Sequence, residues 1–196
     1  MYRFYYNHST GGDVLYCIIN PSSYPDRSRK EGDVVALYHG EERIGINFLN
    51  ISKTMKIKAN GMIPAVNEAM LEVINHMLVN AGEAPLPPCP SSGYLIAEVA
   101  SLEEHPLDEK KRIVHLRAGD KNLDTVTRYS NVGVASRVVV ALDHCLKADG
   151  TEFLAHSERS IPIDCEICCE KDLRLGEENK LAFLTEGNPG DDFFAR

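Results

Sequence analysis

The stretch Pro85-Leu86-Pro87-Pro88-Cys89-Pro90-Ser91-Ser92-Gly93 decides the layout of this chain of 196 residues. Prolines so close together fix φ and remove backbone donors, so the stretch fits neither a helix interior nor a central strand. It is typical of a stiff, exposed linker. We therefore expect two domains, residues 1–84 and 94–196, joined by a proline-rich linker at residues 85–93. Each part is long enough to bury a core of its own.

Composition predicts a soluble protein without a membrane span. Hydrophobic residues make up 43% and charged residues 26% of the chain, and no apolar run approaches the roughly 20 residues that cross a bilayer. The start, Met1-Tyr2-Arg3-Phe4-Tyr5-Tyr6, lacks the order of a secretory signal. We expect a cytoplasmic protein whose six cysteines remain thiols.

The acidic charge lies almost wholly in the second part of the chain. Residues 1–90 carry 8 Lys or Arg against 9 Asp or Glu, whereas residues 91–196 carry 13 against 20. Nucleic-acid affinity comes largely from clustered basic residues that neutralise phosphates. Any RNA site in the second part must therefore be a local basic patch.

Short segments rich in β-branched and aromatic residues dominate the first part, with turn-forming clusters between them. They predict four strands, mostly joined as hairpins, at residues 2–6, 14–19, 34–38 and 44–51. A helix is expected next, because apolar residues recur at helical spacing at Val66, Met70, Val73, Ile74, Met77 and Leu78. Pro64 suits its first turn and Gly82 its end. The first part is thus expected to be α+β, an antiparallel sheet with one amphipathic helix packed across it.

The second part shows a different pattern, with several short strands and turns between them. The strands are expected at residues 94–102, 113–117, 123–127, 137–142 and 181–184. Five strands in about a hundred residues predict a small closed barrel.

Local motifs in this second part resemble the tRNA-binding OB-fold domain. They are Tyr94-Leu-Ile-Ala-Glu-Val, Glu104-His-Pro-Leu-Asp-Glu-Lys110, Ser130-Asn-Val132, Arg137-Val-Val-Val-Ala141 and the run from Arg159 to Leu173. That domain occurs in YtpR-type tRNA-binding proteins and near the N-terminus of the bacterial phenylalanyl-tRNA synthetase β subunit. The resemblance covers nearly all of residues 94–194, and YtpR-type proteins also carry a preceding α+β segment of about this length.

The resemblance implies a C-terminal five-stranded OB-fold β-barrel that binds tRNA or another structured RNA without catalysis, and a homodimer formed through the barrel. In such a barrel, basic side chains would neutralise the RNA backbone while an aromatic ring stacks on a base and an amide hydrogen-bonds it. The candidates in this chain are Lys110, Lys111, Arg112, Arg128, Tyr129, Asn131 and Arg159.

An interaction module is the alternative to RNA binding. In that interpretation Lys110, Lys111 and Arg112 form a solvated loop, neutralised by the acidic residues around it, and Tyr129 packs on the barrel. The barrel then serves dimerisation or docking to a protein, which suits the acidic balance of this part of the chain.

We expect no metal site, no enzyme active site and no cofactor. Cys165, Cys168 and Cys169 lack a second pair with the same spacing, and a closed zinc site needs four ligands. In the resembled domain this segment is a strand, which would make Cys168 a small buried residue. The sequence contains no phosphate-cradling glycine loop and no nucleophile elbow, and His105 is expected to shape its loop.

Overall fold

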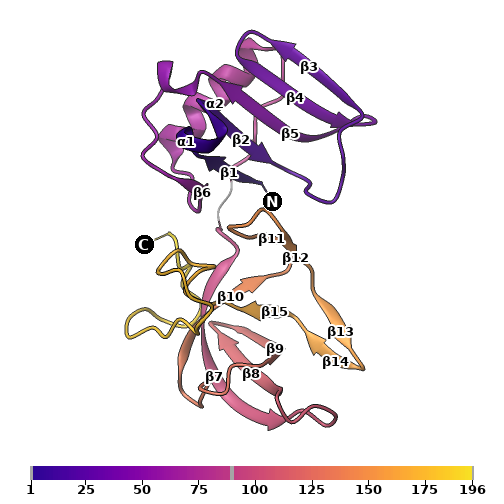
Figure 1. The fold of residues 1–196 in the computed structure, drawn as a ribbon, viewed down its shortest axis with the longest axis vertical. Helices are drawn as coiled ribbons and strands as arrows, with labels where there is room; N and C mark the ends of the chain where they lie inside the picture. Colours follow the sequence, from indigo (N-terminus) through magenta and orange to yellow (C-terminus); the bar gives the residue numbers. More distant parts are fainter. Residues whose placement is uncertain (1, 89–90, 196) are drawn as a thin grey trace. The chain divides into compact units, whose positions relative to one another are not determined.

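The computed structural model describes residues 2–88 and 91–195, and these fall into two compact units, one within residues 1–90 and one within residues 91–196 (Figure 1). We call them the first and the second unit. Two positions of the expected linker, Cys89 and Pro90, lie outside the described residues. Leu86 and Ser92, two other residues of the expected linker, are buried at 4% and 6% exposure. Within the part of the chain described, no helix is long and apolar enough to cross a membrane.

The first unit is a six-stranded antiparallel sheet with one long helix, as the sequence predicted in outline. The strand order is β3-β4-β5-β2-β1-β6. Its elements are β1 (Arg3–Tyr6), α1 (His8–Gly11), β2 (Val14–Ile18), β3 (Arg27–Glu31), β4 (Val34–His39), β5 (Glu42–Leu49), a 3-10 turn (Ile51–Lys53), β6 (Gly61–Ile63) and α2 (Glu68–Asn80). The sequence did not predict β3 and β6. All five residues of β3 are exposed, so this edge strand has no apolar alternation.

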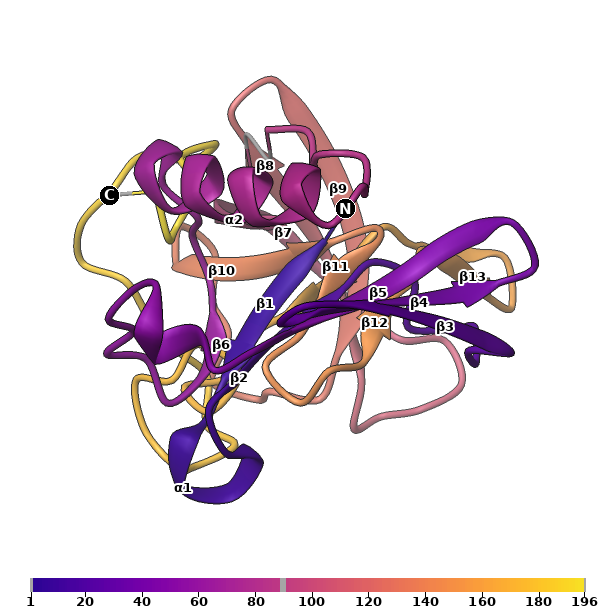
Figure 2. The ribbon, with the colours of Figure 1, turned by 90° about the horizontal axis from the view of Figure 1, so that it is seen from above.

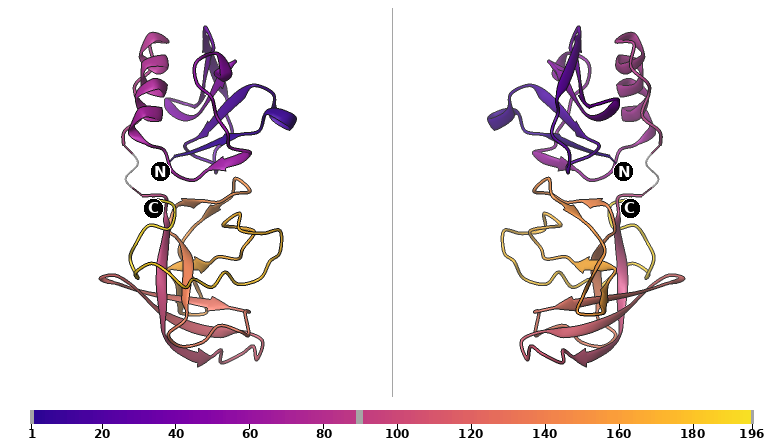
Figure 3. Two further views of the ribbon diagram at one scale, coloured as in Figure 1. Left: turned by 90° about the vertical axis from the view of Figure 1, so that its left-hand side faces the viewer. Right: turned by 90° about the vertical axis from the view of Figure 1, so that its right-hand side faces the viewer.

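Helix α2 covers one face of this sheet (Figures 2 and 3). Its buried side chains, Ile74 and Leu78, pack with Phe4, Leu15 and Phe48 in one core, and full burial of such a side chain contributes about 1.5–3 kcal/mol. The helix starts later than we expected. Asn67 caps it by accepting a hydrogen bond from the Met70 amide at 2.8 Å, so Pro64 lies before the first turn. Gly82 follows the helix end with φ at +69°, as expected of a helix stop.

The second unit is a nearly closed five-stranded antiparallel barrel, which confirms the predicted fold class. The order β15-β10-β7-β8-β9 is made by β7 (Tyr94–Glu104), β8 (Arg112–Ala118), β9 (Lys121–Thr127), β10 (Arg137–Leu142) and β15 (Cys165–Ile167). Two small hairpins precede β15, namely β11 (Cys145–Leu146) with β12 (Glu152–Phe153) and β13 (His156–Glu158) with β14 (Ile161–Ile163).

A long, bent strand and two hydrogen-bonded ends give the barrel its shape. β7 pairs with β10 through residues 94–98 and with β8 through residues 98–104, with a register shift between Val99 and Ser101. Such a bulge bends the strand, so that its first part pairs with β10 and its second part with β8. The seam closes where the Asp164 amide donates to the Asp124 carbonyl at 2.8 Å. Beside it, the Thr125 hydroxyl donates to the Cys165 carbonyl at 2.6 Å.

One expected barrel strand was placed wrongly. Residues 181–184 do not form a strand, and only isolated bridges join Leu181 to Cys169 and Phe183 to Val138. The fifth barrel strand is β15 instead. The corresponding segment of the resembled domain is also a strand. Local pattern alone cannot separate the two segments, because both are short and apolar.

Candidate nucleic-acid interface

The loop between β7 and β8 carries two of the predicted basic residues, Lys110 and Lys111, and a third, Arg112, begins β8. Asp108 organises it, because its carboxylate accepts from the Lys110 amide at 3.0 Å and its carbonyl accepts from the Lys111 amide at 2.9 Å. His105 is buried, and its Nδ1 accepts from the Leu107 amide at 3.3 Å. The imidazole therefore has a loop-shaping contact of the kind we expected.

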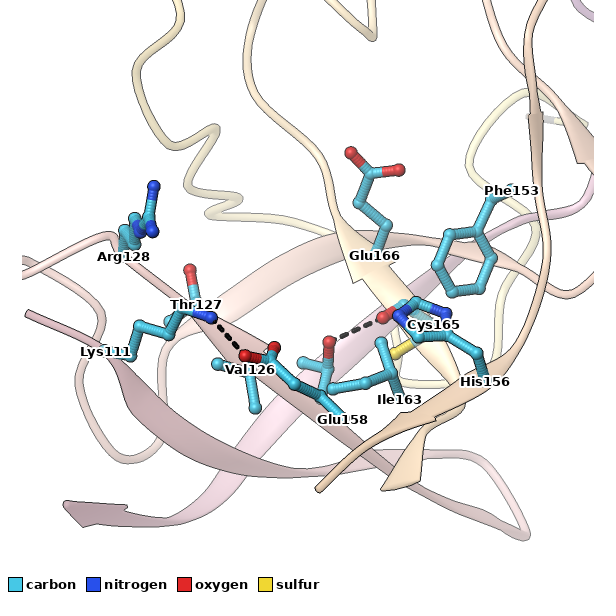
Figure 4. Close-up of a pocket in the computed structure, with 11 residues that line it drawn as sticks. Lys111, Val126, Thr127, Arg128, Phe153, His156, Glu158, Ile163, Cys165 and Glu166 are labelled. Atoms are coloured by element: carbon cyan, nitrogen blue, oxygen red, sulfur yellow. Dashed lines mark hydrogen bonds and ion pairs between the residues drawn. The ribbon is translucent and has the colours of Figure 1, made fainter. Parts of the chain in front are cut away.

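An open groove of about 370 Å³ lies on the barrel beside β9 and the β13–β14 hairpin. Figure 4 shows Lys111 and Arg128 at one end of the groove and the rings of Phe153 and His156 at the other, with Glu158 between them. The groove brings together side chains that lie as far as 55 positions apart in the sequence, from Lys111 to Glu166. Cations and aromatic rings along one groove are the combination that OB-type barrels use for single-stranded nucleic acid.

The two cations that line the groove both have acidic neighbours. The Lys111 ammonium lies 2.6 Å from a carboxylate oxygen of Glu158, and its side chain is 16% exposed. Arg128 is far more open, at 74% exposure, and its guanidinium is 4.0 Å from Asp108. The hydrogen bond from Lys111 lowers the pKa of the Glu158 carboxyl, even though desolvation acts in the opposite direction. Lys111 is thus already paired, whereas Arg128 is held loosely.

The other predicted residues do not line this groove. Lys110 and Arg112 are exposed and adjoin Lys111 in sequence, and Asn131 is exposed in the loop after β9. Arg159 is exposed in the turn between β13 and β14, with φ at +50°. Tyr129 packs partly against the barrel core, and burial, with the nearby Cys169 and Asp172, raises the pKa of its phenol to about 12. Its ring is therefore only partly available for stacking.

Sequence reasoning missed several residues of the groove. Phe153, His156, Glu158 and Glu166 all line it, and the His156 Nδ1 lies 2.9 Å from the Leu154 carbonyl. The motif His156-Ser157-Glu158 was too generic to single out as chemistry. Only the placement of β12, the β13–β14 hairpin and β15 around one groove gives these residues a shared site.

The cysteines of the second unit behave as core residues. Cys165 and Cys168 are 0% and 1% exposed, and burial raises the pKa of both thiols well above their usual range. A metal ligand must be a thiolate. Among residues 2–88 and 91–195, no group of three or more His, Cys, Asp or Glu side chains is placed to hold a metal ion.

Comparison with known proteins gives similarity along the whole chain. The YtpR protein of Bacillus subtilis, which is named as a tRNA-binding protein, is 28% identical over 200 aligned residues that cover 98% of this chain and 99% of that protein. The model of a domain of unknown function (DUF4479) matches residues 21–85. The resemblance to YtpR-type proteins is thereby confirmed.

Two weaker similarities concern a tRNA ligase. The phenylalanine–tRNA ligase β subunit of Leptospira biflexa is 30% identical over 112 residues, which is 57% of this chain and 14% of that subunit. The same subunit of Leptospira interrogans is 30% identical over 92 residues, 47% of this chain and 11% of the subunit. These matches concern only a small part of a much longer protein.

Proposed function

We propose that the second unit is an OB-fold domain that binds tRNA without catalysis, through the groove between β9 and the β13–β14 hairpin. The observation that carries the proposal is the alignment of Lys111 and Arg128 with the rings of Phe153 and His156 along one groove. The name of the Bacillus subtilis relative supports tRNA as the ligand. We place the protein in the cytoplasm, where tRNA is available.

The groove would act in two ways on the RNA. Arg128, together with Lys110 and Arg112 nearby, would neutralise phosphates, and His156 would offer a ring against which a base stacks. Because the second unit is acidic overall, binding would depend on this local patch and would weaken steeply as salt rises.

The test is tRNA binding by fluorescence anisotropy at about 50 and 200 mM salt. The variant Arg128→Glu should lose most of the salt-sensitive binding. Lys121→Glu is the matched control, because Lys121 pairs with Ala118 at the far end of the β8–β9 ladder, whereas Arg112 pairs with Thr127 at the groove end. Those ends are roughly 20 Å apart at the rise of a strand. Absence of binding at low salt would refute the proposal, as would equal losses in both variants.

A protein-interaction or dimerisation role is the second candidate, and the ion pair between Lys111 and Glu158 favours it, since a paired cation attracts phosphate less. Several large apolar side chains of the second unit are also exposed, among them Leu107, Val134 and Leu175. Sedimentation of the full chain at several concentrations separates the two. A homodimer whose dissociation does not depend on salt concentration, in a protein that binds no tRNA, would favour the interaction module.

A further inference from the structure

A second hollow, of about 420 Å³, lies in the first unit on the sheet face opposite α2. The face is fixed by the register. Tyr5 pairs with Tyr16, and Tyr16 pairs with Asn47, so these three side chains point to one side. Their neighbours along the strands, Phe4 and Ile46, point to the other side and join the core under the helix.

Gly45 forms the floor of the hollow. It pairs with Ile18 on one side and Leu37 on the other, so those two residues lie about 10 Å apart, two strand spacings, and Gly45 contributes no side chain between them. A methyl group added at Gly45 would come within 3.2 Å of the Cys17 carbonyl and 3.5 Å of a Leu37 methyl. The absence of a side chain at this position therefore keeps the space open. Pro21 and Pro25, from the segment after β2, complete the wall.

The lining limits what the hollow can bind. None of the lining side chains is charged, so a phosphate or carboxylate in it would lose water without gaining a cationic partner. Asn47 is half-buried, and within residues 2–88 and 91–195 no hydrogen bond to its side-chain amide is found. A purely aliphatic ligand would cover this amide and leave it unbonded, which is costly.

We propose that this hollow, which we call the Gly45 pocket, binds a flat, uncharged ring with hydrogen-bond groups on its edge, and that its natural occupant is a nucleobase. The Asn47 amide presents a donor and an acceptor side by side, which matches the neighbouring acceptor and donor on a base such as adenine. Tyr5 and Tyr16 provide aromatic surface for the ring. The Tyr16 hydroxyl donates to the Gly11 carbonyl at 3.2 Å, which fixes the orientation of that side chain.

The proposal does not rest on the function proposed for the barrel. The decisive probe is adenosine, which carries no phosphate and gives the cations of the second unit nothing to neutralise. Loss of tRNA binding by the barrel and loss of adenosine binding by the Gly45 pocket are thus separate results.

The experiment is a titration of the isotope-labelled full chain with adenosine, followed by amide NMR shifts. We expect saturable shifts centred on residues 16–18 and 44–47. AMP should bind within about threefold of adenosine, because no cation lines the pocket. A short adenosine oligonucleotide that binds at least about tenfold tighter than adenosine would identify an RNA base as the source, and equal binding would identify a free nucleoside.

Asn47→Leu keeps the side-chain volume and removes the amide, so it should weaken adenosine binding about tenfold. The matched control is Asn122→Leu, at an exposed position of β9, which should change nothing. The absence of saturable shifts with adenosine, guanosine, cytidine and uridine up to about 10 mM would overturn the proposal. AMP binding over ten times tighter than adenosine would also overturn it. If Asn47→Leu does not fold, the shifts of the wild-type protein still show whether adenosine binds at residues 16–18 and 44–47.

Discussion

The contact between Lys111 and Glu158 is the residue-scale feature that bears most on RNA binding. The carboxylate occupies the ammonium group that a phosphate would use, at 2.6 Å. We predict that Glu158→Gln strengthens tRNA binding about threefold at low salt and steepens the salt dependence by about 0.7–0.9, the value of one further neutralised phosphate. Anisotropy titrations over a salt series measure both quantities.

Glu177→Gln is the control for this change, since Glu177 is exposed in the segment after β15 and does not line the groove. It removes the same charge from the second unit. If both variants strengthen binding equally, the effect is one of net charge, and Glu158 has no special part in it.

His115 supplies a residue-scale prediction about pH. Its Nδ1 is 2.7 Å from Asp124 and its Nε2 is 3.4 Å from Glu103. The hydrogen bond to Asp124 outweighs burial and, with the charges of both carboxylates, raises the pKa of the imidazole. The protonated ring therefore stabilises the fold fully below about pH 6.5, the unfolded value, and this stabilisation is lost as pH rises through the raised pKa.

We accordingly expect the melting temperature to fall between pH 6 and pH 8.5, approximately, and to fall less in His115→Gln, which keeps a hydrogen-bond donor but does not titrate. His76→Gln, on the exposed face of α2, should follow the wild type. Parallel melting curves of all three proteins would contradict this role for His115.

At this same scale, the sequence predicted only two of the eleven residues that line the groove, Lys111 and Arg128. Lys111 and Arg128 were identifiable because basic residues in barrel loops have a known chemical use. Their partners were not identifiable, since Glu158 lies 47 positions from Lys111 and nothing local in His156-Ser157-Glu158 indicates which strand it faces. Ion pairs between distant segments depend on topology, and topology is what a local pattern leaves undetermined.

At the scale of elements, the longer strands that bury apolar residues were predicted, and the polar edge strand was not. β10 carries four consecutive buried residues and β8 buries four of its seven, whereas β3, with the sequence Arg-Ser-Arg-Lys-Glu, has only polar side chains. β3 exists because its backbone pairs with β4 over five residues. Edge strands with charged side chains are protected from pairing with other chains. Because such strands lack apolar residues at alternate positions, hydrophobic periodicity does not identify them in a sequence.

The seam between β9 and β15 gives the element-scale prediction. Thr125 is 2% exposed and its hydroxyl donates to the Cys165 carbonyl across the closing edge of the barrel. Thr125→Val has the same shape but cannot donate, so the carbonyl loses this partner in a buried place. We expect the free energy of unfolding to fall by about 1–3 kcal/mol, as measured by urea denaturation. Thr185→Val, at an exposed position, should leave it nearly unchanged, and similar losses in both would refute the proposed seam.

At the scale of the whole molecule, the chain divides into two compact units, within residues 1–90 and 91–196, and the sequence alone left open where the second unit begins. We expected residue 94. In the structure, the Asp192 carboxylate accepts from the Ser92 amide and hydroxyl at 2.6 Å each and from the Ser91 hydroxyl at 3.0 Å. These bonds join positions about 100 residues apart. Serines after a proline run resemble any loop, so their contribution to the barrel was not visible in the sequence.

This difference in boundary has a measurable consequence. Burial acts to raise the pKa of Asp192, yet the hydrogen bonds from Ser92, Phe194 and Ser91 together lower it, so the ionised carboxylate stabilises the fold at neutral pH and loses this effect as pH falls. We predict that a chain of residues 91–196 folds cooperatively and binds tRNA with the salt dependence of the full chain, because the groove belongs wholly to the second unit. A chain of residues 94–196 should melt at least about 5 °C lower, since it lacks the Ser91 and Ser92 donors to Asp192 and keeps only the Phe194 amide.

Ser91→Ala/Ser92→Ala within residues 91–196 is the matched control, because it removes the hydroxyls without shortening the chain. If the hydroxyls provide most of the stabilisation, this variant should reproduce most of the lower melting temperature. The Ser92 amide, which the variant keeps, should account for the remainder. Equal melting temperatures for the two chain lengths would mean that Asp192 finds other donors and that the second unit begins at Tyr94. A chain of residues 91–196 that folds but loses tRNA binding would instead show that the first unit takes part in holding the RNA.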